Sequence, residues 1–168
     1  NYFKNLQIKD NTQQKDVGAV AKKDAKKEKT KYDLKALQQL PFFRSLKPEL
    51  SNFLLKNSSV YAFAPQTLIC KAGDSSRDLY VLLSGEAAIY KPMPEFRQFI
   101  SILSISSVFG EAGFFLGKKR TSDILTLKQS QVLVVPYQAE VLDQFLNKEK
   151  VQELQQRFWV QHALFHSD

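Results

Sequence analysis

Apolar residues recur along this chain with two different periods, which separate helical from extended stretches. Between residues 32 and 62, leucine and phenylalanine side chains repeat at the spacing of one helical face, as at Leu34 and Leu37. Pro41 interrupts this pattern, and Pro48 lies where a second helix can begin, because proline is tolerated in the first helical turn. The sequence therefore predicts a helical segment with a break.

From about residue 60 the pattern changes to short runs rich in β-branched and aromatic residues, separated by turn signals. The predicted strands are 60–63, 67–70, 79–83, 87–90, 98–103, 124–127 and 132–135. Strands this short at near-regular spacing favour a sandwich or a jelly-roll barrel. Gly73 and Gly85 are expected to supply positive-φ turns at the corners of this barrel, which makes them structural residues.

The apolar spacing becomes helical again from residue 137 onward. Val151, Leu154 and Phe158 share one face of the last predicted helix, whereas Trp159 lies off that face. A helix that is apolar over more than one face must cover another surface. We expect it to cover the mouth of the barrel or to pack on a second copy of itself, which would give a homodimer.

Composition divides the chain into a basic leader, residues 1–31, and a folded domain, residues 32–168. The leader holds nine Lys and four acidic residues, so it carries +5 of the net charge of +7. It is too polar to fold alone and is predicted to be a flexible linker or tail. Because Ala, Lys and Glu are good helix formers, residues 21–28 could instead form a helix docked on a partner.

Composition also excludes several classes of protein. The chain has 168 residues, enough for one domain, and no apolar run of about 20 residues that could insert into a membrane. With most of the positive charge in the leader, the folded part shows no basic stripe for nucleic acid. The single cysteine, Cys70, excludes an internal disulfide and fits a reducing compartment, so a cytoplasmic location is expected.

The candidate chemistry lies in the stretch 109–123, which reads FGEAGFFLGKKRTSD. Gly110 lets the backbone approach a ligand closely. Glu111 only accepts hydrogen bonds, which suits a hydroxylated ligand, and Arg120 offers a charged fork that matches phosphate oxygens. A ligand with ribose hydroxyls and a phosphate would satisfy this set. Taken alone, Glu111 and Arg120 could also form an ordinary surface ion pair.

This stretch resembles the phosphate-binding cassette of cyclic nucleotide-binding domains, in which F-G-E, a short helix and an R-[TA]-[AS] run occur at the same separation. Three further phrases of this chain are similar to the same family and occur in the same order: LPFFRSLKPEL at 40–50, KAGD at 71–74 and LYVLLSGE at 79–86. The resemblance covers roughly residues 33–165. It implies a mainly β fold, a jelly-roll β-barrel with an N-terminal helical lead-in, a short cassette helix and C-terminal lid helices.

The resemblance also implies roles for individual residues. Gly110 and Ala112 would contact the cyclic phosphate through backbone N–H groups or lie at the helix start that does. Glu111 would accept the ribose 2′-hydroxyl, and Arg120 would pair with the phosphate oxygens. Thr121 lies where a hydroxyl can reach the phosphate and the exocyclic amine of guanine, so cGMP is plausible and cAMP remains open.

The family's C-terminal segment is a hinge and lid that swings over the base, and Arg157, Phe158 and Trp159 are the candidate lid residues here. A regulatory module of this kind binds cAMP or cGMP, needs no cofactor and transmits binding to an output domain or partner protein.

Two departures from the family motif favour an alternative interpretation. Ser106-Ser107 replaces the usual Gly-Asp in the turn before the cassette, and Asp123 adds a negative charge that we expect to face solvent. The alternative is a barrel that has lost its ligand and acts as a structural or protein-interaction domain.

An enzyme is not expected. A metal-dependent barrel enzyme needs two or more histidines and a carboxylate on its strands, but His162 and His166 both lie in the predicted last helix. Cys70 lies in a predicted strand without a nearby histidine, so it is expected to be a buried small hydrophobe. No P-loop, G-x-S-x-G or dinucleotide-binding motif is present.

Overall fold

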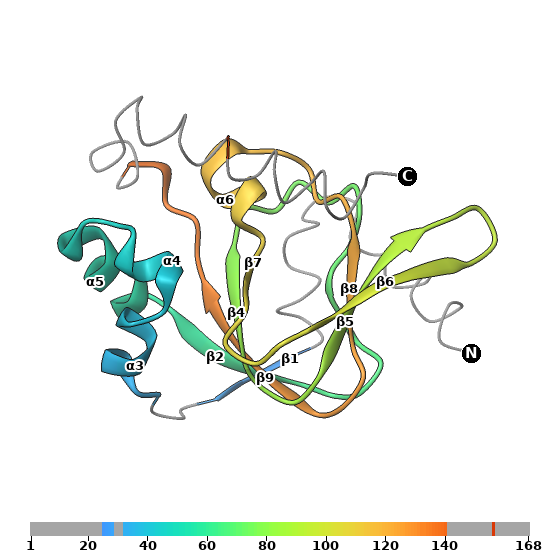
Figure 1. Cartoon of the computed structure of the whole chain (residues 1–168), viewed down its shortest axis with the longest axis horizontal. Coiled ribbons are helices and arrows are strands. Elements are labelled where there is room, and N and C mark those ends of the chain that lie inside the picture. Colours follow the sequence, from blue (N-terminus) through green and yellow to red (C-terminus); the bar gives the residue numbers. More distant parts are fainter. Residues whose placement is uncertain (1–24, 29–31, 141–155, 157–168) are drawn as a thin grey trace.

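The computed structural model describes residues 25–28, 32–140 and 156, which form two antiparallel sheets flanked by short helices (Figure 1). The helices are α3 (Leu34–Gln38), α4 (Pro41–Arg44), α5 (Pro48–Lys56) and α6 (Glu111–Leu116). The strands are β1 (Ala25–Glu28), β2 (Ser59–Phe63), β3 (Leu68–Cys70), β4 (Leu79–Ser84), β5 (Ala87–Pro92), β6 (Arg97–Leu103), β7 (Val108–Phe109), β8 (Asp123–Thr126) and β9 (Ser130–Val135).

One sheet has the strand order β1-β2-β9-β4-β7 and the other the order β3-β8-β5-β6. The first sheet is covered on both faces. Strand β4 shows this, because its successive side chains point to opposite faces of the sheet. Tyr80 and Leu82 join a core cluster with Ile69 and Ile124 of the second sheet. Leu79 and Val81, which point the other way, belong to a second cluster with the helices, so the first four of the six residues of β4 are all buried.

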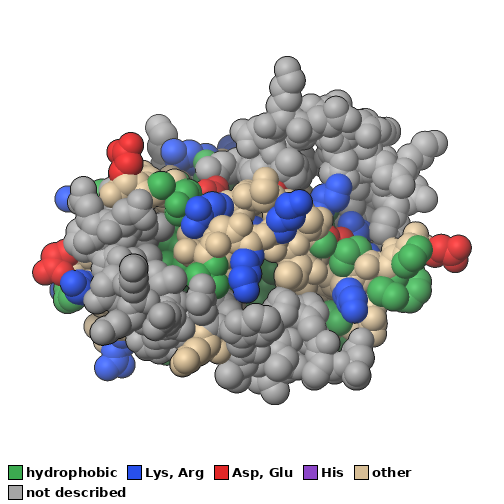
Figure 2. Space-filling view, turned by 90° about the horizontal axis from the view of Figure 1, so that it is seen from above, with side chains coloured by type: hydrophobic (Ala, Val, Ile, Leu, Met, Phe, Trp, Pro, Cys, Tyr) green, Lys and Arg blue, Asp and Glu red, His purple; other side chains and the backbone are tan. Residues whose placement is uncertain are grey.

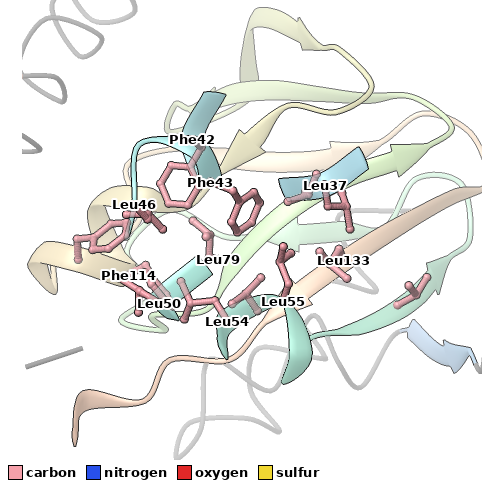
Figure 3. Packing of buried hydrophobic residues seen from close by; sticks show 14 residues of the cluster. Leu37, Phe42, Phe43, Leu46, Leu50, Leu54, Leu55, Leu79, Phe114 and Leu133 are labelled. Carbon is pink, nitrogen blue, oxygen red and sulfur yellow. The ribbon is translucent and has the colours of Figure 1, made fainter. Parts of the chain in front are cut away.

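The second cluster attaches the helical lead-in to the first sheet. Figure 3 shows Phe43, Leu50, Leu54 and Leu55 from α4 and α5 gathered around the strand residue Leu79. Both α4 and α5 begin with the proline that the sequence marked as a break or start, because proline lacks the N–H group that the first helical turn leaves unbonded. The predicted broken helical segment is therefore confirmed.

The predicted fold class is confirmed for the described residues, although the two sheets do not close into a complete barrel. All seven predicted strands are present within one or two residues at each end. Gly73 and Gly85 have the expected positive φ, 86° and 90°. The sequence missed the two-residue strand β7, which lies just before α6 and is too short to show a period. Of the C-terminal helical tail predicted from residue 137 onward, only residues 137–140 and 156 are described, and the candidate lid lies outside the described part.

Strand β1 contradicts a helix at the end of the basic leader. Its four residues, AKKE, pair antiparallel with β2 in the register Ala25 to Phe63 through Glu28 to Val60. Lys26 and Lys27 are exposed, as is common on an edge strand, whose charged side chains discourage pairing with other chains. Backbone pairing with β2 thus overrides the local helix preference. The rest of the leader, residues 1–24 and 29–31, lies outside the described residues.

No helix among the described residues is long and apolar enough to cross a membrane.

Candidate functional site

The candidate site is built around Arg120, which lies between α6 and β8 with only 7% of its surface exposed. Its Nη1 donates a hydrogen bond to the Gly110 carbonyl oxygen at 2.8 Å, and its Nη2 donates to the Asp78 carbonyl oxygen. Its Nε lies 3.4 Å from the Ser76 hydroxyl, and the guanidinium carbon lies 5.4 Å from the centroid of the Tyr80 ring. These contacts hold the guanidinium in one orientation.

The main chain of Arg120 is held as firmly as its side chain. The Arg120 N–H donates to the Asp74 carbonyl oxygen at 2.8 Å, and the Gly73 N–H donates to the Arg120 carbonyl oxygen at 2.7 Å. The loop that follows β3 therefore runs beside Arg120 and fixes its position. A buried arginine with both its backbone and side chain fixed is pre-organised for a ligand, because little conformational entropy is lost on binding.

Arg120 makes no ion pair in the part of the chain that the structure describes, so the surface pair with Glu111 considered from sequence is not formed. No ion pair joins it to the nearby Asp74. Its Oδ1 accepts the Ser76 N–H at 2.9 Å, and burial raises the pKa of its carboxyl despite this bond and the positive charge of Arg120. A buried charge without a counter-ion is costly, and a bound anion would supply the missing charge.

Gly110 lies at the junction of β7 and α6, and its φ of 85° lies in the left-handed region that favours glycine. A Cβ atom at this position would lie 2.6 Å from Arg120 Nη1 and 3.0 Å from the Asp78 carbonyl oxygen. Gly113, one turn further along α6, is crowded in the same way, since its Cβ would lie 2.8 Å from Arg120 Nη1. Both glycines are therefore required for the backbone to pack against the guanidinium.

The structure brings the five predicted ligand-binding residues into one region. Gly110 caps α6, Glu111 and Ala112 form its first turn and are partly exposed, and Arg120 contacts Gly110 directly. Thr121 is exposed and its hydroxyl makes no hydrogen bond among the described residues. Their individual roles toward a ligand stay predictions. Seen from above in Figure 2, several Lys and Arg side chains lie in the middle of this face of the molecule.

The expectation that Asp123 faces solvent is wrong. Asp123 is buried, its Oδ2 accepts a hydrogen bond from Arg97 Nε at 2.7 Å, and its Oδ1 accepts the Ala72 N–H at 2.7 Å. The salt bridge with Arg97 neutralises the carboxylate, so its charge does not oppose an anion at Arg120. The Ser106-Ser107 departure is accommodated as well, because Ser106 takes a left-handed φ of 74° in the turn.

Sequence reasoning missed the residues of the 74–78 segment that surround the guanidinium. Ser76 and the Asp78 carbonyl oxygen contact Arg120, and Arg77 contacts the carbonyl end of α6. The available signal was the polar run DSSRD directly before the apolar strand β4, which indicates a loop but not its contacts with Arg120. The contact of Arg120 with the Asp78 carbonyl oxygen could not be predicted from residue types, because every residue has a backbone carbonyl.

Cys70 is buried in the core between the two sheets, as predicted. Burial raises the pKa of its thiol to about 11 despite the nearby positive charge of Arg120. The thiol is therefore protonated at neutral pH and behaves as a small apolar side chain.

A family model for the cyclic nucleotide-binding domain matches residues 61–149, more than half of the chain. The chain belongs to the cyclic nucleotide-binding domain family. This family is a regulatory binding domain, and the match spans β2 to β9 with the complete cassette.

Solved structures with the same fold share little sequence with this cyclic nucleotide-binding domain. The sensor domain of the transcriptional regulator DNR from Pseudomonas aeruginosa is 20% identical with a TM-score of 0.62, over 78% of this chain and 91% of that one. The regulatory domain of Toxoplasma gondii PKA, solved with cAMP, is 16% identical with a TM-score of 0.61, over 71% and 45%.

A third structure holds a different ligand. It is the regulatory subunit of a cAMP-independent protein kinase A from Trypanosoma cruzi bound to guanosine, 15% identical with a TM-score of 0.61, over 78% of this chain and 47% of that one. This chain thus spans less than half the length of the two kinase subunits. No curated protein matches the sequence significantly.

The candidate lid residues Arg157, Phe158 and Trp159 of this cyclic nucleotide-binding domain lie outside the described residues, as do His162 and His166. In the described part of the chain, no group of three or more His, Cys, Asp or Glu side chains could hold a metal ion.

Proposed function

We propose that this domain binds a cyclic nucleotide, cAMP or cGMP, with Arg120 as the anchor for the cyclic phosphate. The observation that carries the proposal is a buried guanidinium without a carboxylate partner among the described residues. Its contacts with Ser76, Asp78 and Gly110 use three of the five N–H groups of an arginine, one on each nitrogen. One N–H group on each terminal nitrogen is left for phosphate oxygens, which matches bidentate recognition.

The neighbouring residues complete the proposal. Gly110 and Ala112 would present backbone N–H groups, and Glu111 would accept a ribose 2′-hydroxyl. Thr121 is exposed, and its hydroxyl would contact a phosphate or a guanine amine. Binding would then be transmitted to an output domain or partner through the C-terminal segment around Arg157, Phe158 and Trp159. The domain would act as a binding module in the cytoplasm and not as an enzyme.

Titration calorimetry with cAMP, cGMP and guanosine tests this proposal. We expect R120Q to weaken binding of the cyclic nucleotide by about a hundredfold, because truncating one partner of a buried charged hydrogen bond costs about 2–5 kcal/mol. The matched control is K119Q, which removes the same charge from an exposed neighbour and should leave affinity nearly unchanged. Circular dichroism of both variants checks that the fold is intact.

The three ligands separate the alternatives. Because guanosine lacks the phosphate, it should bind R120Q and the wild type equally if it binds at all. Equal affinity of R120Q and wild type for the cyclic nucleotide would contradict the proposed anchor. Absence of heat with all three ligands, together with no thermal shift, would favour a barrel that acts only as a protein-interaction domain.

A further inference from the structure

Asp78, the residue before β4, links the Arg120 site to the segment after β9. Its main-chain carbonyl oxygen accepts a hydrogen bond from Arg120 Nη2. Its carboxylate Oδ1 accepts the main-chain N–H of Tyr137 at 3.2 Å. One residue therefore contacts the guanidinium through its backbone and a second chain segment, two residues past β9, through its side chain.

Arg77, its neighbour, makes a parallel connection between α6 and the same tyrosine. Arg77 Nε donates to the Gly113 carbonyl oxygen at 2.8 Å, and Nη2 donates to the Phe114 carbonyl oxygen at 2.9 Å. Its guanidinium carbon lies 3.7 Å from the centroid of the Tyr137 ring. A cation over an aromatic face is attractive, and a cation at the carbonyl end of a helix is favourable, so both contacts stabilise the same side-chain position.

Direct packing closes the network between α6 and Tyr137. The rings of Phe114 and Tyr137 meet edge to face, with centroids 5.9 Å apart. Gly117, just after α6, lies so close to Arg77 that a Cβ there would be 3.4 Å from the guanidinium carbon. The cassette helix, the anchor Arg120 and Tyr137 are thus connected through two adjacent residues, Arg77 and Asp78.

We propose that Arg77 and Asp78 are positioning residues that couple the anion site at Arg120 to the segment after β9, with Tyr137 as the residue that responds. In its ligand-dependent part this inference rests on the proposed nucleotide binding. An anion on Arg120 attracts the guanidinium that the Asp78 carbonyl also holds. A shift of the Asp78 main chain then moves the carboxylate that accepts the Tyr137 N–H, and a shift of α6 moves Arg77 under the Tyr137 ring.

Hydrogen exchange at the Tyr137 amide, followed by NMR, tests the coupling without any ligand. D78A keeps the main-chain carbonyl that Arg120 uses and removes the acceptor of the Tyr137 N–H, so this amide should exchange about fivefold faster, as expected for loss of one hydrogen bond. D78N, which keeps a side-chain oxygen acceptor, should restore slow exchange. R120Q should alter Tyr137 exchange in the wild-type background but not in an R77Q/D78A background.

The ligand-dependent test repeats the measurement at saturating cAMP and cGMP, with binding verified by calorimetry. Nucleotide should change the shift and exchange of the Tyr137 amide in the wild type, whereas R77Q/D78A, at a nucleotide concentration that calorimetry shows to saturate it, should lose this response. The amide at position 137 should still respond in Y137F, which keeps the aromatic ring over Arg77, and should respond weakly in Y137L.

Each outcome decides one of the two proposals. An R120Q variant with unchanged Tyr137 exchange overturns the coupling, and so does a nucleotide response that persists in R77Q/D78A. A wild type that gives no heat with either nucleotide overturns the proposed function. In that case an effect of R120Q on Tyr137 still supports the coupling, because that measurement contains no nucleotide.

Discussion

Arg97 Nε donates a hydrogen bond to Asp123 Oδ2 at 2.7 Å, and the two side chains are only 12% and 5% exposed. The pair joins the β5–β6 hairpin to the first residue of β8. Asp123 also accepts the Ala72 N–H and lies three residues after Arg120. The salt bridge therefore helps to fix the start of β8, three residues after the candidate phosphate anchor.

Breaking this pair should be costly. We expect R97Q to lower the free energy of unfolding by about 3 kcal/mol, because it leaves the Asp123 carboxylate buried without a counter-ion. Urea denaturation measures the loss. The matched control is K128Q, which removes the exposed pair of Lys128 with Glu86, whose atoms are 3.9 Å apart, and should cost less than about 1 kcal/mol. Equal losses in the two variants would show that the buried pair contributes no more than a surface pair.

Gly113 should resist a substitution that usually stabilises helices. In an ordinary helix interior, Gly to Ala gains about 1 kcal/mol. Here the new Cβ would lie 2.8 Å from Arg120 Nη1 and 3.1 Å from the Ser76 carbonyl oxygen. We therefore expect G113A to lower the free energy of unfolding and to weaken cyclic nucleotide binding by displacing the guanidinium.

The contrasting variant is G73A, since a Cβ at Gly73 would have no neighbour within 4 Å although its φ is 86°. G73A should lower stability through backbone strain alone, by about 1 kcal/mol, and leave affinity unchanged. Calorimetry and urea denaturation on both variants provide the comparison. A G113A variant that is more stable than wild type and binds equally well would rule out the crowding around Arg120.

Ser106 carries backbone strain that glycine would relieve. Its φ of 74° lies in the left-handed region, which disfavours residues with a Cβ. We expect S106G to raise the free energy of unfolding by about 1 kcal/mol. Ser107, for which no positive φ is found, is the matched control, and S107G should be neutral or destabilising. Thermal and urea unfolding that rank the two variants the other way would contradict this account of the turn.

The carboxyl of Asp74 should make stability depend on pH in the opposite sense to an ion-paired acid. Burial raises the pKa of Asp74 in the folded state, so the native protein binds this proton more tightly than the unfolded chain does. The contribution of Asp74 to stability is therefore greatest at low pH. It is lost as pH rises from the unfolded pKa, about 3.9, through the folded pKa.

The measurement is urea denaturation of wild type and D74N between about pH 3.5 and 7, a range that begins near the ordinary pKa of an aspartate and extends well above it. Asn keeps an oxygen that can accept the Ser76 N–H but does not titrate. The stability of wild type relative to D74N should fall with increasing pH and then level off. A difference that rises with pH would mean that Asp74 is stabilised as a charged group.

Much of the fold could be predicted because its signals are local. The break at Pro41 and the helix start at Pro48 follow from proline chemistry, and Gly73 and Gly85 follow from the turns they form. The cassette likewise lies within one short stretch, so the spacing of Gly110 and Arg120 is visible in the sequence. Strand β1 could not be predicted in this way, because its lysine-rich residues are extended only through pairing with β2.

The sequence by itself thus determined the order of the helical lead-in and the seven predicted strands, and the positions of Gly110 and Arg120 in the cassette. Only the tertiary structure decided how those residues are used. Asp123 is buried because Arg97, 26 positions away, neutralises it. Arg120 is oriented by a carbonyl oxygen 42 positions away, and Tyr137 is held by a carboxylate 59 positions away. Such partners are brought together by the packing of the two sheets, a long-range effect that no local pattern encodes.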